Sequence, residues 1–209
     1  MAAIQAKPTR MELSNLKKRK QVAVRGHKMM KDKRDELVRR FIVYARRNKE
    51  QREEVERKLT LAMQNFVLAR ASMSNAEIEE ALLYPARAAS VETSEESVLS
   101  ISVPKLSLET QEGFTYPYGY ATTSAELDGA VQQLAEVLPL MLELAETEKT
   151  CGRLADEIEK TRRRVNALEY VMIPQFTETI RSIQMKLDEN DRQSTTRLMK
   201  TKEMLAKQK

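Results

Sequence analysis

The feature that most constrains the fold is a long stretch without helix breakers. No proline lies between Pro8 and Pro85, and Gly26 is the only glycine there. A Thr-x-x-Glu capping box at Thr9 marks its start. The stretch predicts one helix from about Thr9 to about Met73, on the order of 95 Å long. A helix of this length has no compact core to lie in, so a coiled coil is its usual setting.

Heptad spacing supports a coiled coil. Seam positions recur by alternating steps of three and four residues, and one extra step of four after Val55 resembles a stutter, which would locally unwind the supercoil. Lys20, Arg34, Asn48 and Gln51 occupy core-type positions, where polar side chains cost stability but can fix the register. The predicted seam residues are Leu13, Leu16, Lys20, Ala23, His27, Met30, Arg34, Leu37, Phe41, Tyr44, Asn48, Gln51, Val55, Leu59, Ala62, Phe66, Ala69 and Met73.

The last third of the chain predicts the partner helix. Ser124 is its N-cap candidate, and apolar residues mostly spaced three and four apart place one stripe on its surface. Pro139 and Pro174 lie inside it; each removes a backbone donor, so bends are expected near both. The predicted stripe is Leu127, Val131, Leu134, Leu138, Met141, Leu144, Cys151, Leu154, Ile158, Val165, Leu168, Met172, Phe176, Ile180, Ile183 and Leu187.

The helical pattern breaks between residues 74 and 123. A short helix is expected over about residues 76–83, and near-alternation from Val98 to Leu108 predicts a strand or hairpin. Residues 73–126 hold 2 Lys+Arg against 9 Asp+Glu, so this insert is acidic. A loop that merely joins two helices needs only a few residues. The insert is therefore a candidate docking surface, with the tyrosines at its end as candidate contact residues: Tyr116, Tyr118 and Tyr120.

These patterns predict an all-α fold: a long antiparallel two-helix coiled coil with a mixed insert, a short helix plus a β-hairpin, at the turn end. The expected division is residues 1–73 for the first long helix, 74–123 for the insert and 124–209 for the second long helix. With the insert as the bend, the register would place His27 opposite about Met185 and Phe41 opposite about Met172.

Charge is unevenly spread along the chain. Residues 1–52 hold 17 Lys+Arg against 5 Asp+Glu, a net of +12, while the whole chain has a net charge of +5. A basic end suggests an acidic partner, nucleic acid or a membrane surface, although a solvated helix face is an equal alternative. No run of about 18 apolar residues exists to span a membrane. Met1 to Lys7 lacks the apolar core of a signal peptide.

Residue types needed for catalysis are scarce. His27 is the only histidine, so no two-histidine metal site exists, and a packed or hydrogen-bonded seam residue is its expected role. No Ser–His–Asp arrangement and no glycine-rich phosphate loop appears. Cys151 is expected to be a buried structural thiol. The sequence therefore predicts a protein that is not an enzyme and holds no cofactor or metal ion.

Several long blocks at both ends of the chain resemble the D subunit of V-type and archaeal A-type rotary ATPases. They stand in the family's order and cover essentially the whole chain. The blocks are Pro8-Thr9-Arg10-Met11-Glu12-Leu13; residues 25–37, Arg-Gly-His-Lys-Met-Met-Lys-Asp-Lys-Arg-Asp-Glu-Leu; residues 162–170, Arg-Arg-Arg-Val-Asn-Ala-Leu-Glu-Tyr, with Ile173-Pro174 and Thr179-Ile180; and Lys186-Leu187-Asp188-Glu189-Asn190-Asp191-Arg192.

The resemblance implies a central rotor shaft. Such a shaft couples ATP hydrolysis or synthesis in a catalytic hexamer of A and B subunits to proton or sodium ion translocation. Further implied partners are the small F subunit of the central stalk and a socket subunit linking to the membrane ring, in a cytoplasmic complex peripheral to the membrane. Arg162, Arg163 and Arg164 become candidate head contacts. The alternatives are a passive coiled-coil scaffold or a basic helical nucleic-acid-binding protein; the latter is weak because no stacking aromatics accompany the basic runs.

Overall fold

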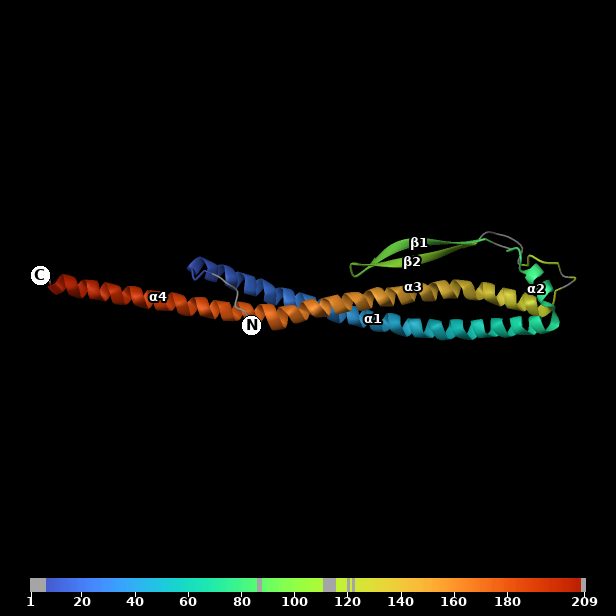
Figure 1. Ribbon diagram of the computed structural model, residues 1–209, viewed down its shortest axis with the longest axis horizontal. Coiled ribbons are helices and arrows are strands. Elements are labelled where there is room, and N and C mark those ends of the chain that lie inside the picture. The colour runs from blue at the N-terminus through green and yellow to red at the C-terminus, as the bar shows by residue number, and fades with distance from the viewer. Residues whose placement is uncertain (1–6, 86–87, 111–115, 120, 122, 208–209) are drawn as a thin grey trace. The chain divides into compact units, whose positions relative to one another are not determined.

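A computed structural model describes residues 7–85, 88–110, 116–119, 121 and 123–207. Two long helical stretches flank a small insert, which confirms the predicted fold class (Figure 1). The chain divides into two compact units, one of Met1–Glu36 and Ile158–Lys209 and one of Leu37–Glu157. The elements are α1 (Arg10–Ser72), α2 (Asn75–Ala81), β1 (Ala89–Val98), β2 (Ile101–Thr110), α3 (Ala125–Ala167), the π-helical turn η1 (Leu168–Met172) and α4 (Ile173–Lys207).

The first unit pairs the start of α1 with the end of α3, η1 and α4. Its helices are antiparallel, because Arg10 pairs with Asp191 at 3.0 Å and His27 Nε2 lies 3.2 Å from a carboxylate oxygen of Glu169. Leu16, Phe176 and Ile183 form its apolar core, and Leu13, Ala23, Ile180 and Leu187 pack around them. All these apolar residues lie on the predicted stripes, so the period of the pattern correctly located this core.

The second unit holds the rest of α1 with α2, the hairpin and most of α3. Ala69 of α1, Ala81 of α2 and Leu127 of α3 form its apolar cluster, so the short helix is tied to both long ones. A capping box at Ser74 and Glu77 starts α2. The hydrogen bond from the Ser74 backbone holds the pKa of Glu77 below its ordinary value. The short helix predicted over residues 76–83 is thereby confirmed.

The predicted register is wrong. His27 lies opposite Glu169 rather than Met185, a shift of roughly four helical turns. The reason lies at the bend, where the Ser124 backbone N–H donates to Met73 Sδ at 3.4 Å. The end of α1 and the start of α3 are therefore in direct contact. Residues equally far from Met73 and Ser124 along the two helices face each other, and the insert adds no residues to the helix pair. Phe41 and Met172 belong to different units, and their pairing stays a prediction.

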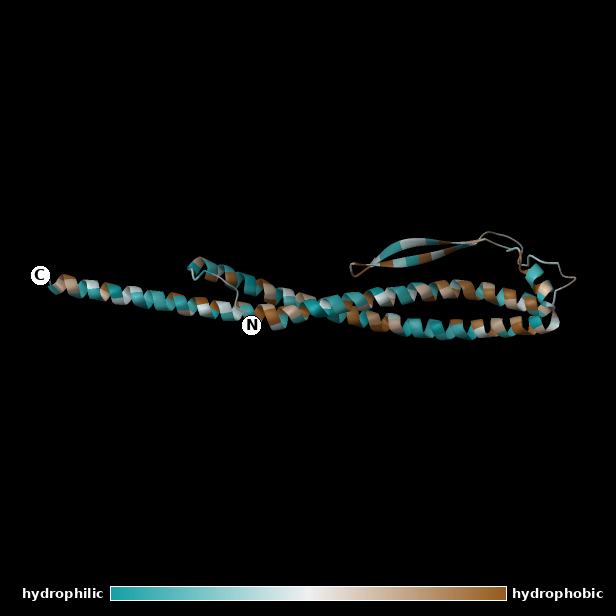
Figure 2. Cartoon of the chain, viewed as in Figure 1, coloured by the Kyte–Doolittle hydropathy of each residue, from teal (hydrophilic) through white to brown (hydrophobic). Residues whose placement is uncertain are grey.

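The buried side of α3 differs from the predicted stripe. Leu127, Leu154 and Val165 are buried as expected, but Leu134, Leu138 and Met141 are 37–45% exposed. Ala, Val and Thr residues are buried instead. Along the long helices, apolar residues form recurrent bands rather than one block (Figure 2). Thr150 and Thr179 keep their hydroxyls satisfied by bonding the carbonyl four residues back, so they fit a tight seam. The buried residues missed on α3 are Ala130, Val137, Thr147, Thr150 and Thr161, and Thr179 is a further one on α4.

The two prolines of the second long stretch behave differently. α3 runs through Pro139 without interruption, and a bend there stays a prediction. Before Pro174 the helix changes to the π form, and the N–H of Ile173 bonds to the carbonyl of Leu168, five residues back. Pro174 has no N–H to offer to the preceding turn, so a widened turn next to it has a physical cause.

The predicted hairpin is confirmed, with β1 antiparallel to β2 over ten residue pairs. Its two-residue turn consists of Leu99 and Ser100, which both have positive φ, 52° and 66°. Such values suit the right-handed twist of a two-residue hairpin but usually call for Gly or Asn. No local signal in the sequence therefore marks where the turn lies.

Candidate partner-binding surfaces

All three arginines of the triplet Arg162–Arg164, near the end of α3, are exposed. Buried Thr161 and Val165 bracket it, so the three arginines point away from the seam. Arg163 pairs with Glu159 one turn earlier; this bond lowers the pKa of Glu159 and raises that of Arg163. Arg162 and Arg164 make no ion pair within the described ranges. The triplet thus offers an exposed concentration of positive charge to a partner.

The π-helical turn lies a few residues beyond the triplet. Tyr170, Val171 and Met172 are 41–62% exposed, so the turn presents three consecutive apolar side chains to solvent. Glu169 within the turn bonds His27 of α1, which confirms that His27 is a hydrogen-bonded seam residue. The apolar spacing predicted that Met172 lies in the seam and gave no sign that Tyr170, Val171 and Met172 are exposed together. The reason is that the periodicity assumes an unbroken α-helix.

Of the three candidate docking tyrosines, the two that the structure describes, Tyr116 and Tyr118, are both half-buried. Tyr118 packs against the Ala69 cluster and donates its hydroxyl to Asp128 at 2.7 Å, so its polar group is used inside the unit. Tyr116 lies beside it, with ring centroids 5.9 Å apart. Tyr120 lies outside the described residues. The docking role of the three stays a prediction.

A hollow beside Tyr118 has a mixed acidic and apolar lining. Its volume is about 310 Å³, and its lining includes Glu77, Glu80, Leu83 and Tyr84. Leu83 and Tyr84, just after α2, are 67% and 73% exposed. Large apolar side chains at such exposure next to carboxylates favour a partner contact at this end of the unit. The only sequence signal was their position just before Pro85.

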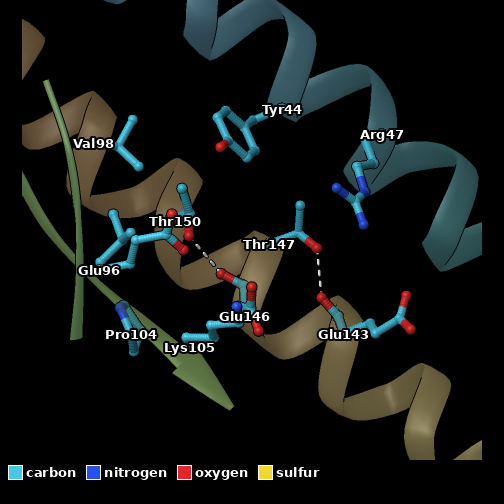
Figure 3. Close-up of a pocket in the computed structure, with 11 residues that line it drawn as sticks. Tyr44, Arg47, Glu96, Val98, Pro104, Lys105, Glu143, Glu146, Thr147 and Thr150 are labelled. Carbon is cyan, nitrogen blue, oxygen red and sulfur yellow. Dashed lines mark hydrogen bonds between the residues drawn. The ribbon is translucent and has the colours of Figure 1, made fainter. Parts of the chain in front are cut away.

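The hairpin rests on α3 through a small and mostly polar contact. Val103 of β2 is buried, the backbone N–H of Leu106 donates to Glu146 at 3.1 Å, and Arg153 donates to the carbonyl of Ser102. A cavity of about 230 Å³ lies between the hairpin and the helices (Figure 3). Its lining contains both signs of charge. Arg47 and Lys105 are the basic residues, and Glu96, Glu143 and Glu146 are the acidic ones.

The seam between the long helices carries polar bonds as well as apolar contacts. Thr147 donates to Gln51 at 2.6 Å, Asn65 donates to Gln133 at 3.0 Å, and Arg52 pairs with Glu148. The hydrogen bond to Glu148 raises the pKa of Arg52. The predicted polar seam position at Gln51 is thus confirmed. The buried amide nitrogen of Asn48 and the hydroxyls of Ser124 and Thr161 have no partner within the described ranges. Ser124 therefore precedes α3 as expected but does not cap it through its side chain.

Chemistry-bearing clusters are lacking over the described ranges. No group of three or more His, Cys, Asp or Glu side chains is placed to hold a metal ion among these residues. Within the same residues, no helix is long and apolar enough to cross a membrane.

Known proteins resemble this chain over nearly its whole length. The family described as the D subunit of ATP synthase matches residues 12–203. A V-type ATP synthase D subunit from Acetivibrio thermocellus is 56% identical, covering 100% of this chain and 95% of the relative. Proteins of the same name from Thermoanaerobacter sp. (strain X514) and Clostridium novyi are 54% and 53% identical, covering 99% and 100% of this chain and 100% and 98% of the relatives. The chain, with its paired long helices and hairpin insert, therefore belongs to the D subunit family of V-type ATP synthases.

Proposed function

We propose that this chain is the central rotor shaft of a V-type ATP synthase. It turns inside a catalytic hexamer and couples ATP hydrolysis or synthesis there to the translocation of protons or sodium ions. It breaks no bonds itself. Nucleotide binding and hydrolysis in the hexamer shift the populations of its conformational states, and an asymmetric shaft that fits each state differently converts these shifts into rotation.

The observation that carries the proposal is the uncovered end of α4. Asp191 is the last residue of α4 that bonds to α1, and residues 192–207 are exposed on every side. Leu198, Met199, Met204 and Leu205 within them are 61–70% exposed. A helix with this much exposed apolar surface needs a surrounding partner. A sleeve formed by the hexamer fits this need, and the exposed Arg162–Arg164 triplet supports a contact with acidic segments of the A and B subunits.

The second unit supplies candidate surfaces for the remaining partners. The acidic insert, with Leu83 and Tyr84 exposed beside Glu77 and Glu80, suits a basic socket that links the shaft to the membrane ring. The exposed stripe of Leu134, Leu138 and Met141 on α3 suits an apolar face of the small F subunit. In this proposal the chain works in the cytoplasm, at the periphery of the membrane.

Rotation of a single molecule tests the proposal directly. A probe attached to an introduced cysteine at exposed position 53 (Glu53→Cys, in a Cys151→Ser background) should turn in one direction when ATP is added to the immobilised hexamer. Purified complexes should contain one chain per hexamer. A passive scaffold would co-purify without turning, and a hexamer that hydrolyses ATP equally well without the chain would contradict coupling.

The docking role of the insert has its own test. Deleting about residues 90–115 should weaken retention of partner subunits and lower turnover, while the long helices still pair. Unchanged retention and turnover would remove the insert from the set of partner contacts.

A further inference from the structure

The outer edge of β1 is an unpaired sheet edge. The sheet has two strands within the described ranges, and β2 lies between β1 and α3 (Figure 1). From Ala89 to Ser97 every residue of β1 is exposed. An open edge of this length offers a row of backbone donors and acceptors to another strand.

The outer edge of β2, in contrast, is already used. The N–H of Leu106 donates to Glu146, and the carbonyl of Ser102 accepts from Arg153. Between these two residues stands Pro104, which has no N–H to offer. Alternate residues of β2 therefore direct their backbone groups away from β1 and toward α3.

The strand register then fixes which groups of β1 face outward. In an antiparallel ladder, directly opposed residues that do not bond each other both turn their N–H and C=O groups outward. The residues opposite the three outward-facing positions of β2 must therefore present their backbone groups at the free edge of β1. These pairs are Thr93 with Leu106, Glu95 with Pro104 and Ser97 with Ser102.

Side-chain bonds on the intervening residues agree with this assignment. The hydroxyl of Ser107 in β2 reaches the carbonyl of Glu92 at 3.5 Å, and the hydroxyl of Ser94 in β1 reaches the carbonyl of Lys105 at 3.4 Å. These carbonyls point toward the neighbouring strand. The intervening residues thus form the inner ladder, and Thr93, Glu95 and Ser97 the outer edge.

The charge of β1 selects the kind of strand that fits. β1 contains Glu92, Glu95 and Glu96 but no Lys, Arg or Pro. Lysine and proline are the residues that most often block an exposed edge, and both are missing here. A second copy of this chain would bring the same three carboxylates to the edge, and opposed like charges destabilise strand pairing. A segment with Lys or Arg side chains would instead be attracted.

We propose that the outer edge of β1 receives an extended, Lys- or Arg-bearing segment of another protein as a third strand of the sheet. The inference rests on the proposed function, so the partner is another subunit of the same ATPase. Main-chain bonds to Thr93, Glu95 and Ser97 hold the added strand in place, and the three glutamates select its charge.

Hydrogen exchange in the purified ATPase complex tests the inference. The amide of Ser97 should exchange at least about tenfold more slowly in the complex than in the free chain, because an added strand occupies it. The double variant Thr93→Pro/Glu95→Pro removes two outward N–H groups and leaves the inner ladder intact. It should abolish the protection of Ser97, while Thr93→Val/Glu95→Gln, which keeps both N–H groups, should retain most of it.

A folding control and a charge-reversal variant separate loss of the added strand from unfolding of the hairpin. Protected amides of Lys105 and Ser107 show that the hairpin of each variant is folded. The charge reversal Glu92→Lys/Glu95→Lys/Glu96→Lys should also reduce the protection of Ser97. Equal exchange of Ser97 in the free chain and the assembled complex overturns the added strand but leaves the rotor function standing. A chain that does not associate with the hexamer overturns both.

Discussion

At the scale of single residues, burial in the seam decides which side chains stabilise the helix pair. Leu154 is fully buried, whereas Leu134 is 37% exposed, although both fit the same apolar spacing. Spacing alone would predict that the two leucines contribute equally to the stability of the helix pair. The side of α3 that faces α1 is set by contacts with the other helix, including the Thr147–Gln51 bond.

Truncating these two leucines separates the observed seam from the predicted one. Leu154→Ala should lower the free energy of unfolding of the isolated chain by about 2–4 kcal/mol, because it leaves a cavity in a packed seam. Leu134→Ala should cost less than about 1 kcal/mol, because a side chain already partly in solvent leaves little cavity. Chemical denaturation of both variants measures the difference. Equal losses would show that the seam runs along the spacing-derived stripe.

Cys151 provides a residue-scale test of pH dependence. Burial, with a smaller effect from Glu148, raises the pKa of its thiol above the ordinary value. The unfolded chain therefore ionises first, so the thiol's contribution to stability is present below the ordinary thiol pKa and is lost as pH rises through the folded-state pKa. At a pH of about 8.5, near the ordinary thiol pKa, alkylation by iodoacetamide should be slower in the folded chain than in urea. Chain carrying Cys151→Ser is the control, and equal rates would contradict the shift.

At the scale of elements, the π-helical turn is the clearest departure from a regular coiled coil. It joins α3 to α4 next to Pro174 and exposes Tyr170, Val171 and Met172. The proline was visible in the sequence, but the form of the irregularity was not. A bend, a break or a widened turn can each relieve a missing donor. The surrounding packing, including the Glu169–His27 bond, selects among them.

Replacing the proline tests this account of the turn. Pro174→Ala supplies an N–H that can bond the carbonyl of Tyr170, so the turn should tighten to α-helix and the unfolding free energy should rise by about 1–3 kcal/mol. Amide exchange at position 174 and thermal unfolding measure the effect. Pro139→Ala is the matched control, because α3 already runs through that proline. An unchanged π turn in Pro174→Ala would show that packing alone imposes it.

At the scale of the whole molecule, the proposed partner surfaces combine charge of both signs with exposed apolar side chains. The first unit carries the Arg162–Arg164 triplet and the uncovered end of α4, and the second carries the acidic insert. Chain length and composition exclude none of the three proposed partners, which are the catalytic hexamer, the F subunit and the socket subunit. The family match covers residues 12–203, which include the triplet, the insert and most of α4.

Removing the arginine triplet tests its proposed contact with the catalytic head. Arg162→Ala/Arg163→Ala/Arg164→Ala should weaken assembly or lower coupled ATP turnover severalfold, with the loss growing smaller at high salt because exposed charges are screened. Arg163→Ala alone, which removes the bond to Glu159, controls for helix stability. Unchanged assembly and ATPase rate in the triple variant would exclude the triplet as a head contact.

The sequence by itself determined the two long helices, the short helix and the strand pattern of the insert, because helix breakers, caps and periodicity are local signals. The antiparallel pairing followed from these elements, because two long helices joined at one end by an insert run in opposite directions. Core residues such as Leu16, Leu37 and Ile183 followed from spacing alone. Only the tertiary structure decided the register of the long helices, the threonine-rich buried side of α3, the π turn and the place where the hairpin packs on α3. Each of these depends on contacts between residues far apart in the chain, such as Ser124 with Met73 and Glu146 with Leu106, which no local pattern encodes.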